Sequence, residues 1–388
     1  PPPRPAPRGY TLIELLLAMV VLSIMLVAVV LTMGSIQNAW KITRGDVTEF
    51  QQGRRAIDAI SHALRRATLD PRWSANDDTP TTQGQSLVGL VPDSDLHFVS
   101  GRANDLLPGQ LGLSGHAVFF QAPIGFSGSR RNAQLNNAPD YDTLANTLNN
   151  WGFFVEFGPD DRQLPGFLDQ RFGTLNTQAR RQRFRLMEFR QPSDQLGLFK
   201  LTTGFEEPDI NRFTSTTQLY DWFRQPVRLS SSGNLTQRQV SVVAENILTL
   251  IIAPYEPDIN VLETFATSSS TPYQIAPDYL FDSRRFQWDG GSALGLTTRH
   301  QLPPNVEITV IALDASEWDN LSDAEATSTG HSLVNFVNGH FSNAVNYRND
   351  IDSITRELDR RRLSYRVFTR VIPLNGSAGR LFPLPASS

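Results

Sequence analysis

The sequence predicts an α+β protein in which a long N-terminal helix, transmembrane in its first half, packs on a mostly antiparallel β-sheet head, with a further helix and strand near the C-terminus. Three observations support this fold class. Residues Leu15–Met33 hold only two polar side chains, Ser23 and Thr32. Apolar residues then recur at spacings of three and four as far as Leu69. Beyond Pro71, short apolar runs alternate with clusters of Gly, Pro, Asn, Asp and Ser, as in β structure.

The apolar run has the length of a membrane span, which requires about 20 residues. Glu14 stands at its start. An ionised Glu in hydrocarbon costs at least a few kcal/mol, so an acid at this place indicates a function and a positive partner. Arginines 4 and 8 precede the span while Lys41 and Arg44 follow it, so the positive charges alone do not orient it.

The second half of the helix carries one apolar stripe, which we interpret as a face that packs on the protein's own sheet. The stripe comprises Val47, Phe50, Gly53, Ile57, Ile60, Leu64 and Ala67. We expect the helix to stop near Leu69, because Pro71 restricts the residue before it. The predicted organisation is therefore residues 10–33 in the membrane, 34–69 as an amphipathic extension, and 70–388 as one exported head.

Seven segments of the head have the composition of strands: Leu96–Ser100, Ala117–Gln121, Gly152–Phe157, Arg183–Arg190, Ile247–Ala253, Val306–Leu313 and Tyr365–Ile372. The nearly continuous apolar run of Ile247–Ala253 predicts a central strand. In Val306–Leu313, apolar residues alternate with Glu307 and Thr309, which predicts one solvated face.

A helix is expected shortly before the last strand. Its buried stripe would consist of Tyr347, Ile351, Ile354 and Leu358. On its solvated side we expect the i,i+4 pairs Asp352/Arg356 and Glu357/Arg361.

Composition excludes several classes of function. The chain has 388 residues, a formal net charge of −4 and 19% charged residues, so nothing draws it towards nucleic acid. It contains no cysteine, which excludes disulfides, thiolate metal sites and a Cys nucleophile. The six histidines are scattered without HExxH spacing, so we expect no catalytic metal.

Catalytic motifs are also missing from the sequence. Residues 112–116 and 125–128 each miss the nucleophile-elbow pattern by one position, and we interpret both as turns. No Gly-rich loop is followed by Lys-Ser/Thr. We therefore expect no enzyme, no cofactor and no small-molecule substrate.

Two weaker binding signals remain. Asp93-Ser94-Asp95 and residues 158–161 offer oxygen ligands for calcium, but neither stretch has the spacing of an EF-hand, and a solvated turn is the simpler interpretation. The basic cluster comprises Arg180, Arg181, Arg183, Arg185 and Arg190. We expect it to form a solvated face with acidic neighbours, because single-strand binding also requires interleaved aromatic residues.

The segment Arg8-Gly9-Tyr10-Thr11-Leu12-Ile13-Glu14, followed by the apolar run, resembles the prepilin processing site. The resemblance implies that a membrane-embedded peptidase cuts after Gly9 and methylates the new amine of Tyr10. It also implies a cytoplasmic leader, residues 1–9, and a pilin-like fold. Because the leader lacks a starting Met, we expect truncation there. The new amine would be largely protonated near neutral pH and about one helical turn from Glu14. This places a positive partner beside the acid.

Several downstream segments resemble the Verru_Chthon cassette protein C family. They are residues 184–192, 243–248, 279–284, 300–304 and 365–368. That family is defined by a prepilin N-terminus and by a small gene cassette, so the resemblance adds context rather than a mechanism. In helix length and β-rich head the chain also resembles minor pilins and the J-type minor pseudopilin of type II secretion.

Together these features predict a minor pilin or pseudopilin in the cytoplasmic membrane with its head in the periplasm. We expect it to join, or sit at the tip of, a type IV pilus or type II secretion-like filament. Its expected partners are prepilin peptidase, other pilin-like subunits and the membrane, with Glu14 setting the register of assembly. Two alternatives are a membrane-anchored adhesin that does not polymerise and an exported hydrolase on a pilin-like anchor.

Overall fold

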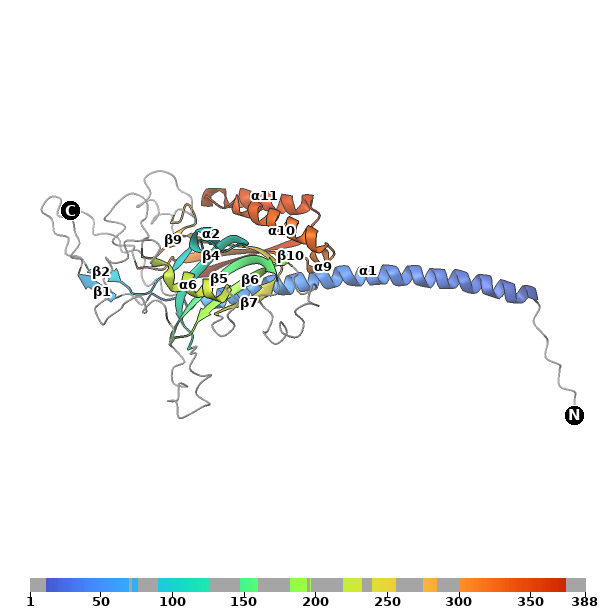
Figure 1. Ribbon diagram of the computed structural model, residues 1–388, viewed down its shortest axis with the longest axis horizontal. Coiled ribbons are helices and arrows are strands. Elements are labelled where there is room, and N and C mark those ends of the chain that lie inside the picture. Colours follow the sequence, from blue (N-terminus) through green and yellow to red (C-terminus); the bar gives the residue numbers. More distant parts are fainter. Residues whose placement is uncertain are drawn as a thin grey trace, which may run out of the picture. The chain divides into compact units, whose positions relative to one another are not determined.

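A computed structural model describes residues 12–69, 72–75, 90–125, 147–159, 182–193, 196, 219–231, 239–255, 275–284 and 300–374. The chain forms two compact units, Pro1–Thr48 and Glu49–Ser388. The helices are α1 (Leu12–Leu64), α2 (Ala103–Leu106), α6 (Asp221–Ser231), α9 (Ala315–Asp319), α10 (Asp323–Asn338), the 3-10 helix η8 (Ala344–Asn346) and α11 (Tyr347–Arg360) (Figure 1). The strands are β1 (Arg72–Ala75), β2 (Leu90–Asp93), β3 (Val99–Arg102), β4 (Leu113–Pro123), β5 (Leu148–Pro159), β6 (Gln182–Gln191), β7 (Val240–Glu245), β8 (Ile247–Tyr255), β9 (Phe281–Asp282), β10 (Asn305–Leu313) and β11 (Tyr365–Pro373).

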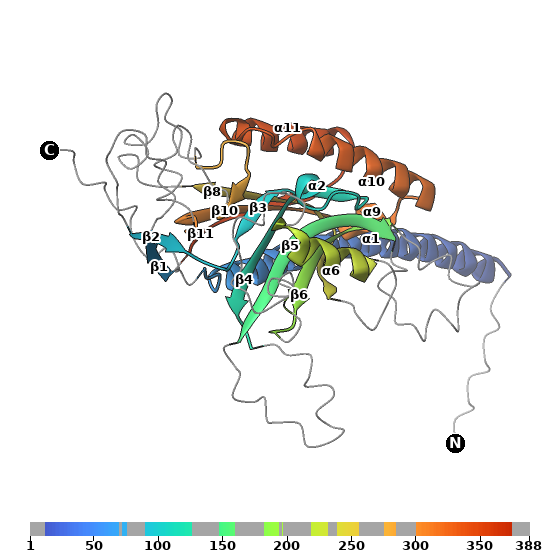
Figure 2. The same cartoon turned by 60° about the vertical axis from the view of Figure 1, so that its left-hand side comes forward.

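The α+β prediction is confirmed: an N-terminal apolar helix is followed by a curled, mostly antiparallel sheet with further helices (Figure 2). The main path of the sheet has the order β11-β10-β8-β4-β5-β6-β7, and β3 and β9 extend it beside β4. One contact is parallel, between Gly115 of β4 and Leu250 of β8. As predicted, β8 is central, since it pairs with β10 on one side and meets β4 on the other.

The junction of β7 and β8 links two parts of the curled sheet. Asn246 alone separates the two strands and has a φ of 57°, in the left-handed region that Asn tolerates. Its N–H donates to the carbonyl of Phe184 in β6 at 2.7 Å, and its own carbonyl accepts from the N–H of Leu313 at 2.8 Å. The chain therefore passes from the β6 side of the sheet to the β10 side within one residue.

In the unit that begins at Glu49, the last turns of α1 lie along β11. Gly53 lies so close to Phe368 that an added Cβ would stand 2.0 Å from the ring. Arg370 donates to Asp58 at 2.7 Å. The predicted stripe is confirmed from Gly53 onwards, since Ile57, Ile60, Leu64 and Ala67 are buried. The side chains of Val47 and Phe50 lie outside the described part.

Helix α1 ends at Leu64, earlier than the predicted Leu69. Two further turns close with i,i+3 hydrogen bonds, including that from Ala67 N–H to the Leu64 carbonyl at 3.0 Å. The N–H of Thr68 then donates to the carbonyl of Gln121 on β4. This bond to the sheet replaces the next helical bond, so tertiary contact ends the helix before the proline does.

All seven predicted strand segments overlap observed strands, although the first is shifted, because β3 begins at Val99 rather than Leu96. The solvated face predicted for β10 is wrong at one position. Thr309 is fully buried, and its hydroxyl bonds to those of Tyr347 and Thr369, the latter at 2.9 Å. The prediction missed the short strands β1, β2, β7 and β9 and the helices α2, α6, α9 and α10.

Helices α10 and α11 lie next to each other along one side of the sheet (Figures 1 and 2). Arg361, which caps α11, donates to Ser332 of α10 at 2.8 Å. A capping box starts α10: the Ser322 hydroxyl accepts from Glu325 N–H, and the Glu325 carboxylate accepts from Ser322 N–H. Gly330 lets α10 approach β5, because a Cβ there would stand 2.0 Å from the Phe157 ring.

The predicted stripe of α11 is confirmed, with Tyr347, Ile354 and Leu358 buried and Ile351 partly buried against the core. Glu357 differs from the prediction, because it is buried rather than solvated. Its carboxylate accepts hydrogen bonds from Arg360 and, at 2.7 Å, from Arg361. These bonds, Arg360 foremost, hold the pKa of Glu357 below its ordinary value, so the ionised form is retained despite burial.

Candidate functional site

The first turn of α1 carries Glu14, the only charged residue between Leu12 and Met33. A carboxylate suits this place electrostatically, because the N-terminal end of a helix dipole is positive. Gly9 and Tyr10, the predicted cleavage and methylation residues, lie outside the described residues.

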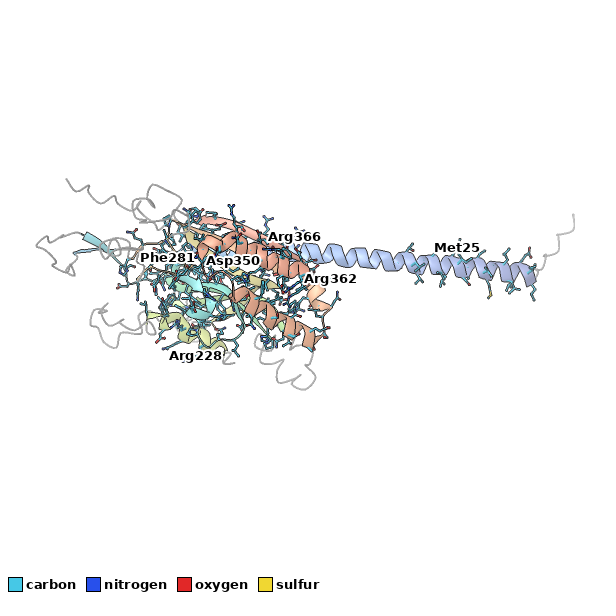
Figure 3. The ribbon with its side chains drawn as sticks, turned by 90° about the horizontal axis from the view of Figure 1, so that it is seen from above. Met25, Arg228, Phe281, Asp350, Arg362 and Arg366 are labelled. Carbon is cyan, nitrogen blue, oxygen red and sulfur yellow. The ribbon has the colours of Figure 1, made fainter. Side chains whose placement is uncertain are left out.

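The rest of this segment presents an apolar surface on all sides. Its large apolar side chains are between 48% (Val21) and 79% (Leu12) exposed within the protein. Ser23 donates to the Met19 carbonyl at 2.8 Å and Thr32 to the Ala28 carbonyl at 2.9 Å, so both hydroxyls are satisfied within the helix. By length and composition Leu12–Met33 is suited to cross a membrane. Figure 3 shows Met25 and its neighbours projecting from this stretch.

The head contains a buried polar cluster that the sequence did not reveal. Asp282 of β9 accepts three hydrogen bonds: from His97 Nε2 at 2.7 Å, from the Tyr220 hydroxyl at 2.8 Å and from Arg284 N–H at 2.9 Å. Trp222 Nε1 donates to His97 Nδ1 at 3.1 Å. These side chains come from three segments far apart in the sequence, so no spacing could have identified them.

The cluster joins elements rather than presenting a base to a substrate. His97 is fully buried, and both of its ring nitrogens are engaged. Burial alone would raise the pKa of Asp282, but His97, the hydroxyl of Tyr220 and the N–H of Arg284 together lower it to about 2. The carboxylate is therefore an ionised acceptor that holds the start of α6 and the segment before β3 onto β9.

A ladder of amide side chains crosses three strands beside this cluster. His97 N–H donates to Gln121 Oε1 at 2.6 Å, Gln121 Nε2 to Asn150 Oδ1 at 3.0 Å, and Asn150 Nδ2 to Gln191 Oε1 at 2.6 Å. The three amides occupy paired positions on β4, β5 and β6. Because a shifted register would leave these buried groups unsatisfied, the ladder fixes the alignment of the strands.

The elbow-like residues 112–116 were predicted as a turn, but only Gly112 precedes β4. Residues 113–116 form the irregular start of that strand, where the register with β5 shifts between Ser114 and Ala117. Gly115 has a φ of 72°, and an added Cβ would stand 2.1 Å from Thr249 Oγ1. His116 is buried and accepts a hydrogen bond from Ile252 N–H at 3.0 Å. Burial lowers the pKa of His116 to about 4, only partly offset by the backbone at Phe341 and Ile252. Of residues 125–128, all but Gly125 lie outside the described part.

The described parts of the two calcium candidates make internal contacts. The Ser94 hydroxyl donates to the Leu69 carbonyl and is buried. The carbonyls of Gly158 and Pro159 accept from Arg185 at 3.0 and 3.2 Å, so a guanidinium occupies the position of a cation. Residues 160 and 161 lie outside the described residues.

The arginine cluster is only partly as predicted. Acidic neighbours are present, because Arg183 pairs with Asp319 at 2.9 Å and with Glu245 at 3.6 Å. The prediction of a solvated side chain is wrong for Arg185, which is buried. This burial lowers the pKa of its guanidinium. Residues 180 and 181 lie outside the described part.

Comparison with known proteins identifies the N-terminal segment. A family model described as the prokaryotic N-terminal methylation motif matches residues 4–30. No curated protein and no solved structure matches the chain.

The match covers the predicted processing site and most of the apolar segment. It supports a type IV pilin-like or pseudopilin-like protein, anchored by one N-terminal helix. The motif implies processing by prepilin peptidase and pilin-like partners in general.

Proposed function

We propose that this chain is a minor pilin or pseudopilin that is cut after Gly9, methylated at Tyr10 and built into, or placed at the tip of, a type IV pilus or type II secretion-like filament. The observation that carries the proposal is Glu14, an acid in the first turn of an apolar helix that lies within the matched methylation motif. The protein acts as a structural component and not as an enzyme. Residues 10–33 anchor it in the cytoplasmic membrane before assembly, and the head is exported to the periplasm.

Glu14 sets the register of assembly. A subunit that enters the filament brings the positive amine of Tyr10 next to an acid in the bundle of apolar helices. The pair neutralises two charges that hydrocarbon disfavours, whereas a shifted position leaves a charge unpaired at a cost of several kcal/mol. The first turn of α1 is suited to this role, because its dipole already favours the carboxylate.

The size of the head favours low-copy incorporation. More than 300 residues follow the apolar segment, and a uniform fibre built from such heads would be crowded. The segments that resemble the Verru_Chthon cassette protein C family agree with a minor subunit encoded with a small set of partners.

The test compares Glu14→Ala with Ser23→Ala, a matched change in the same helix, in cells that contain the peptidase and the other subunits. Cleavage after Gly9 should persist in both variants. The assembled fraction should fall by about tenfold or more for Glu14→Ala alone, because an unpaired charge costs more than 1.4 kcal/mol in this setting.

Equal assembly of Glu14→Ala and wild type would overturn the role of Glu14. A processed wild-type chain that remains wholly in the membrane would instead favour the anchored, non-polymerising adhesin.

A further inference from the structure

Strand β11 provides a long open edge of the sheet in the described part of the protein. It pairs with β10 over nine successive positions, from Asn305↔Pro373 to Leu313↔Tyr365, without a register shift. At the opposite end of the sheet path, the chain leaves β7 through Asn246 and enters β8, which lies between β10 and β4. The side of β11 that faces away from β10 is therefore a template for another strand.

On the face of Val367 and Val371, no charged side chain of β11 protects this edge, because Arg366 and Arg370 lie on the other face. Val367 and Val371 are 39% and 44% exposed, and Thr369 between them is also exposed. The three residues point to the same face of the strand. Natural edges are commonly blocked by bulges, lysines or proline, but here the only proline, Pro373, is at the end of the strand. A row of β-branched residues instead fits cross-strand packing.

The surroundings of this edge are cationic, although the whole chain carries a net charge of −4. Residues 360–374 contain five arginines and no acidic residue, and two of the five, Arg360 and Arg361, are bound to Glu357. Figure 3 shows two of them, Arg362 and Arg366, where α11 ends and β11 begins.

The end of α1 that runs beside β11 carries two exposed arginines, Arg54 and Arg55, and two more, Arg65 and Arg66, follow its last residue, Leu64. The acid among them is Asp58, which pairs with Arg54 at 3.6 Å and with Arg370 at 2.7 Å. The edge therefore offers apolar packing on the face of Val367 and Val371. Positive charge lies on the opposite face of β11 and on the neighbouring end of α1.

We propose that β11 is a docking strand for an extended segment of a neighbouring pilin-like subunit in which carboxylate and β-branched side chains alternate. The segment adds to β11 as an antiparallel strand, so that main-chain hydrogen bonds supply affinity and alternate side chains supply specificity. Its β-branched residues lie opposite Val367, Thr369 and Val371. Its carboxylates lie on the opposite face, beside Arg366 and the pair that Arg370 forms with Asp58. The inference rests on the proposed function for the identity of the neighbour.

The probe is a fluorescent peptide, Val-Glu-Val-Thr-Val-Glu-Val, titrated onto the full-length protein in detergent micelles and followed by anisotropy. The control peptide carries Lys in place of Glu. The acidic peptide should bind saturably and more weakly as salt is raised, whereas the lysine peptide should not bind.

The test variant is Val367→Glu/Val371→Glu, which places acids in the exposed row. It should weaken peptide binding by about tenfold. The matched control is Val345→Glu in η8, where the native residue is 59% exposed and lies outside β11. It should leave binding unchanged. Circular dichroism of each variant must match wild type, which separates loss of docking from loss of folding.

A second measurement uses the absence of cysteine from the chain. Thr369→Cys introduces a single thiol in the middle of the edge. The peptide carries Cys at its third position, on the valine face, and is supplied as a mixed disulfide with 2-thiopyridine, so that it should form a disulfide with the introduced thiol by thiol exchange and release the thiopyridone. Ser328→Cys, at an exposed position on α10, should react at least about tenfold more slowly. Strand pairing with β11 raises the local concentration of the peptide thiol at position 369 but not at position 328.

Three results would overturn the proposal: no saturable binding up to about 1 mM peptide, equal binding of the lysine peptide, or tighter binding of a DNA duplex than of the acidic peptide. These failures are distinguishable from failure of the proposed function, because cleavage after Gly9 and assembly dependent on Glu14 are measured without the peptide.

Discussion

Acid should destabilise the head through His116, and the expected size of the effect follows from its surroundings. The ring is buried, and its Nδ1 accepts a hydrogen bond from the N–H of Ile252 at 3.0 Å. A nitrogen that accepts from an N–H cannot also carry a proton, so protonation at Nδ1 must break this bond. The Ile252 carbonyl, 3.2 Å from Nδ1, can accept from the protonated ring and offsets the loss only in part.

Burial lowers the pKa of His116 from its ordinary 6.5 to about 4. Each pKa unit corresponds to about 1.4 kcal/mol. Protonation of His116 in the unfolded chain but not in the folded protein therefore lowers the free energy of unfolding by about 3 kcal/mol. For a base with a lowered pKa, the unfolded state binds more protons between the two values. Stability is therefore complete above pH 6.5 and is lost progressively down to about pH 4.

The assay is urea unfolding of the full-length protein in detergent, followed by tryptophan fluorescence from pH 7.5 to 4. His116→Gln keeps an acceptor for Ile252 N–H but does not titrate. It should be less stable than wild type at pH 7.5, yet it should lose about 3 kcal/mol less over the acid range. The comparison isolates His116 from the other five histidines. Parallel pH profiles for the two proteins would refute the reasoning.

Three further changes test the packing and the buried polar contacts, each by urea unfolding of the full-length protein. Gly53→Ala should destabilise the protein by about 1–3 kcal/mol, because the new Cβ would stand 2.0 Å from the Phe368 ring. Adding Phe368→Leu to the same chain should recover part of this loss, and no recovery would show that the strain does not come from the Phe368 ring. Ser322→Ala should cost about 1 kcal/mol through loss of the α10 cap, and no change in stability would show that packing alone fixes the start of this helix. Asp282→Asn should cost about 3 kcal/mol, since the carboxylate accepts three buried hydrogen bonds, and a smaller loss than for Ser322→Ala would contradict its joining role.

Elements with a strong period were predictable from the sequence. Regular apolar spacing marked the last turns of α1 and most of α11, and continuous apolar runs marked the central strands. Errors arose where tertiary contacts override local pattern. Thr309 looks solvated in an alternating strand but is buried beneath Tyr347, to whose hydroxyl it bonds. Helix α1 ends at Leu64 because Thr68 bonds to the sheet.

Helix α10 was missed although a signal was available. Ser322 followed three residues later by Glu325 is the sequence form of a capping box. Small and polar residues within the helix conceal its buried face, and Gly330 lowers intrinsic helix propensity. This glycine is required by tertiary packing, because α10 presses on the ring of Phe157.

Glu14 and the cluster around Asp282 also differ in how far the sequence predicts them. Glu14 is identifiable from the sequence, because one charge in a long apolar run is a local signal. The cluster around Asp282 was not identifiable, because Tyr220 and His97 are separated from it by 62 and 185 residues. Only the folded sheet brings these side chains together.

N-terminal processing is tested most directly by mass spectrometry of the N-terminal peptide of the membrane-expressed protein, with and without the cognate prepilin peptidase. The account predicts a chain that begins at Tyr10 and carries an added methyl group only when the peptidase is present. An uncut N-terminus under both conditions would contradict the account, because the amine that it places beside Glu14 would not exist.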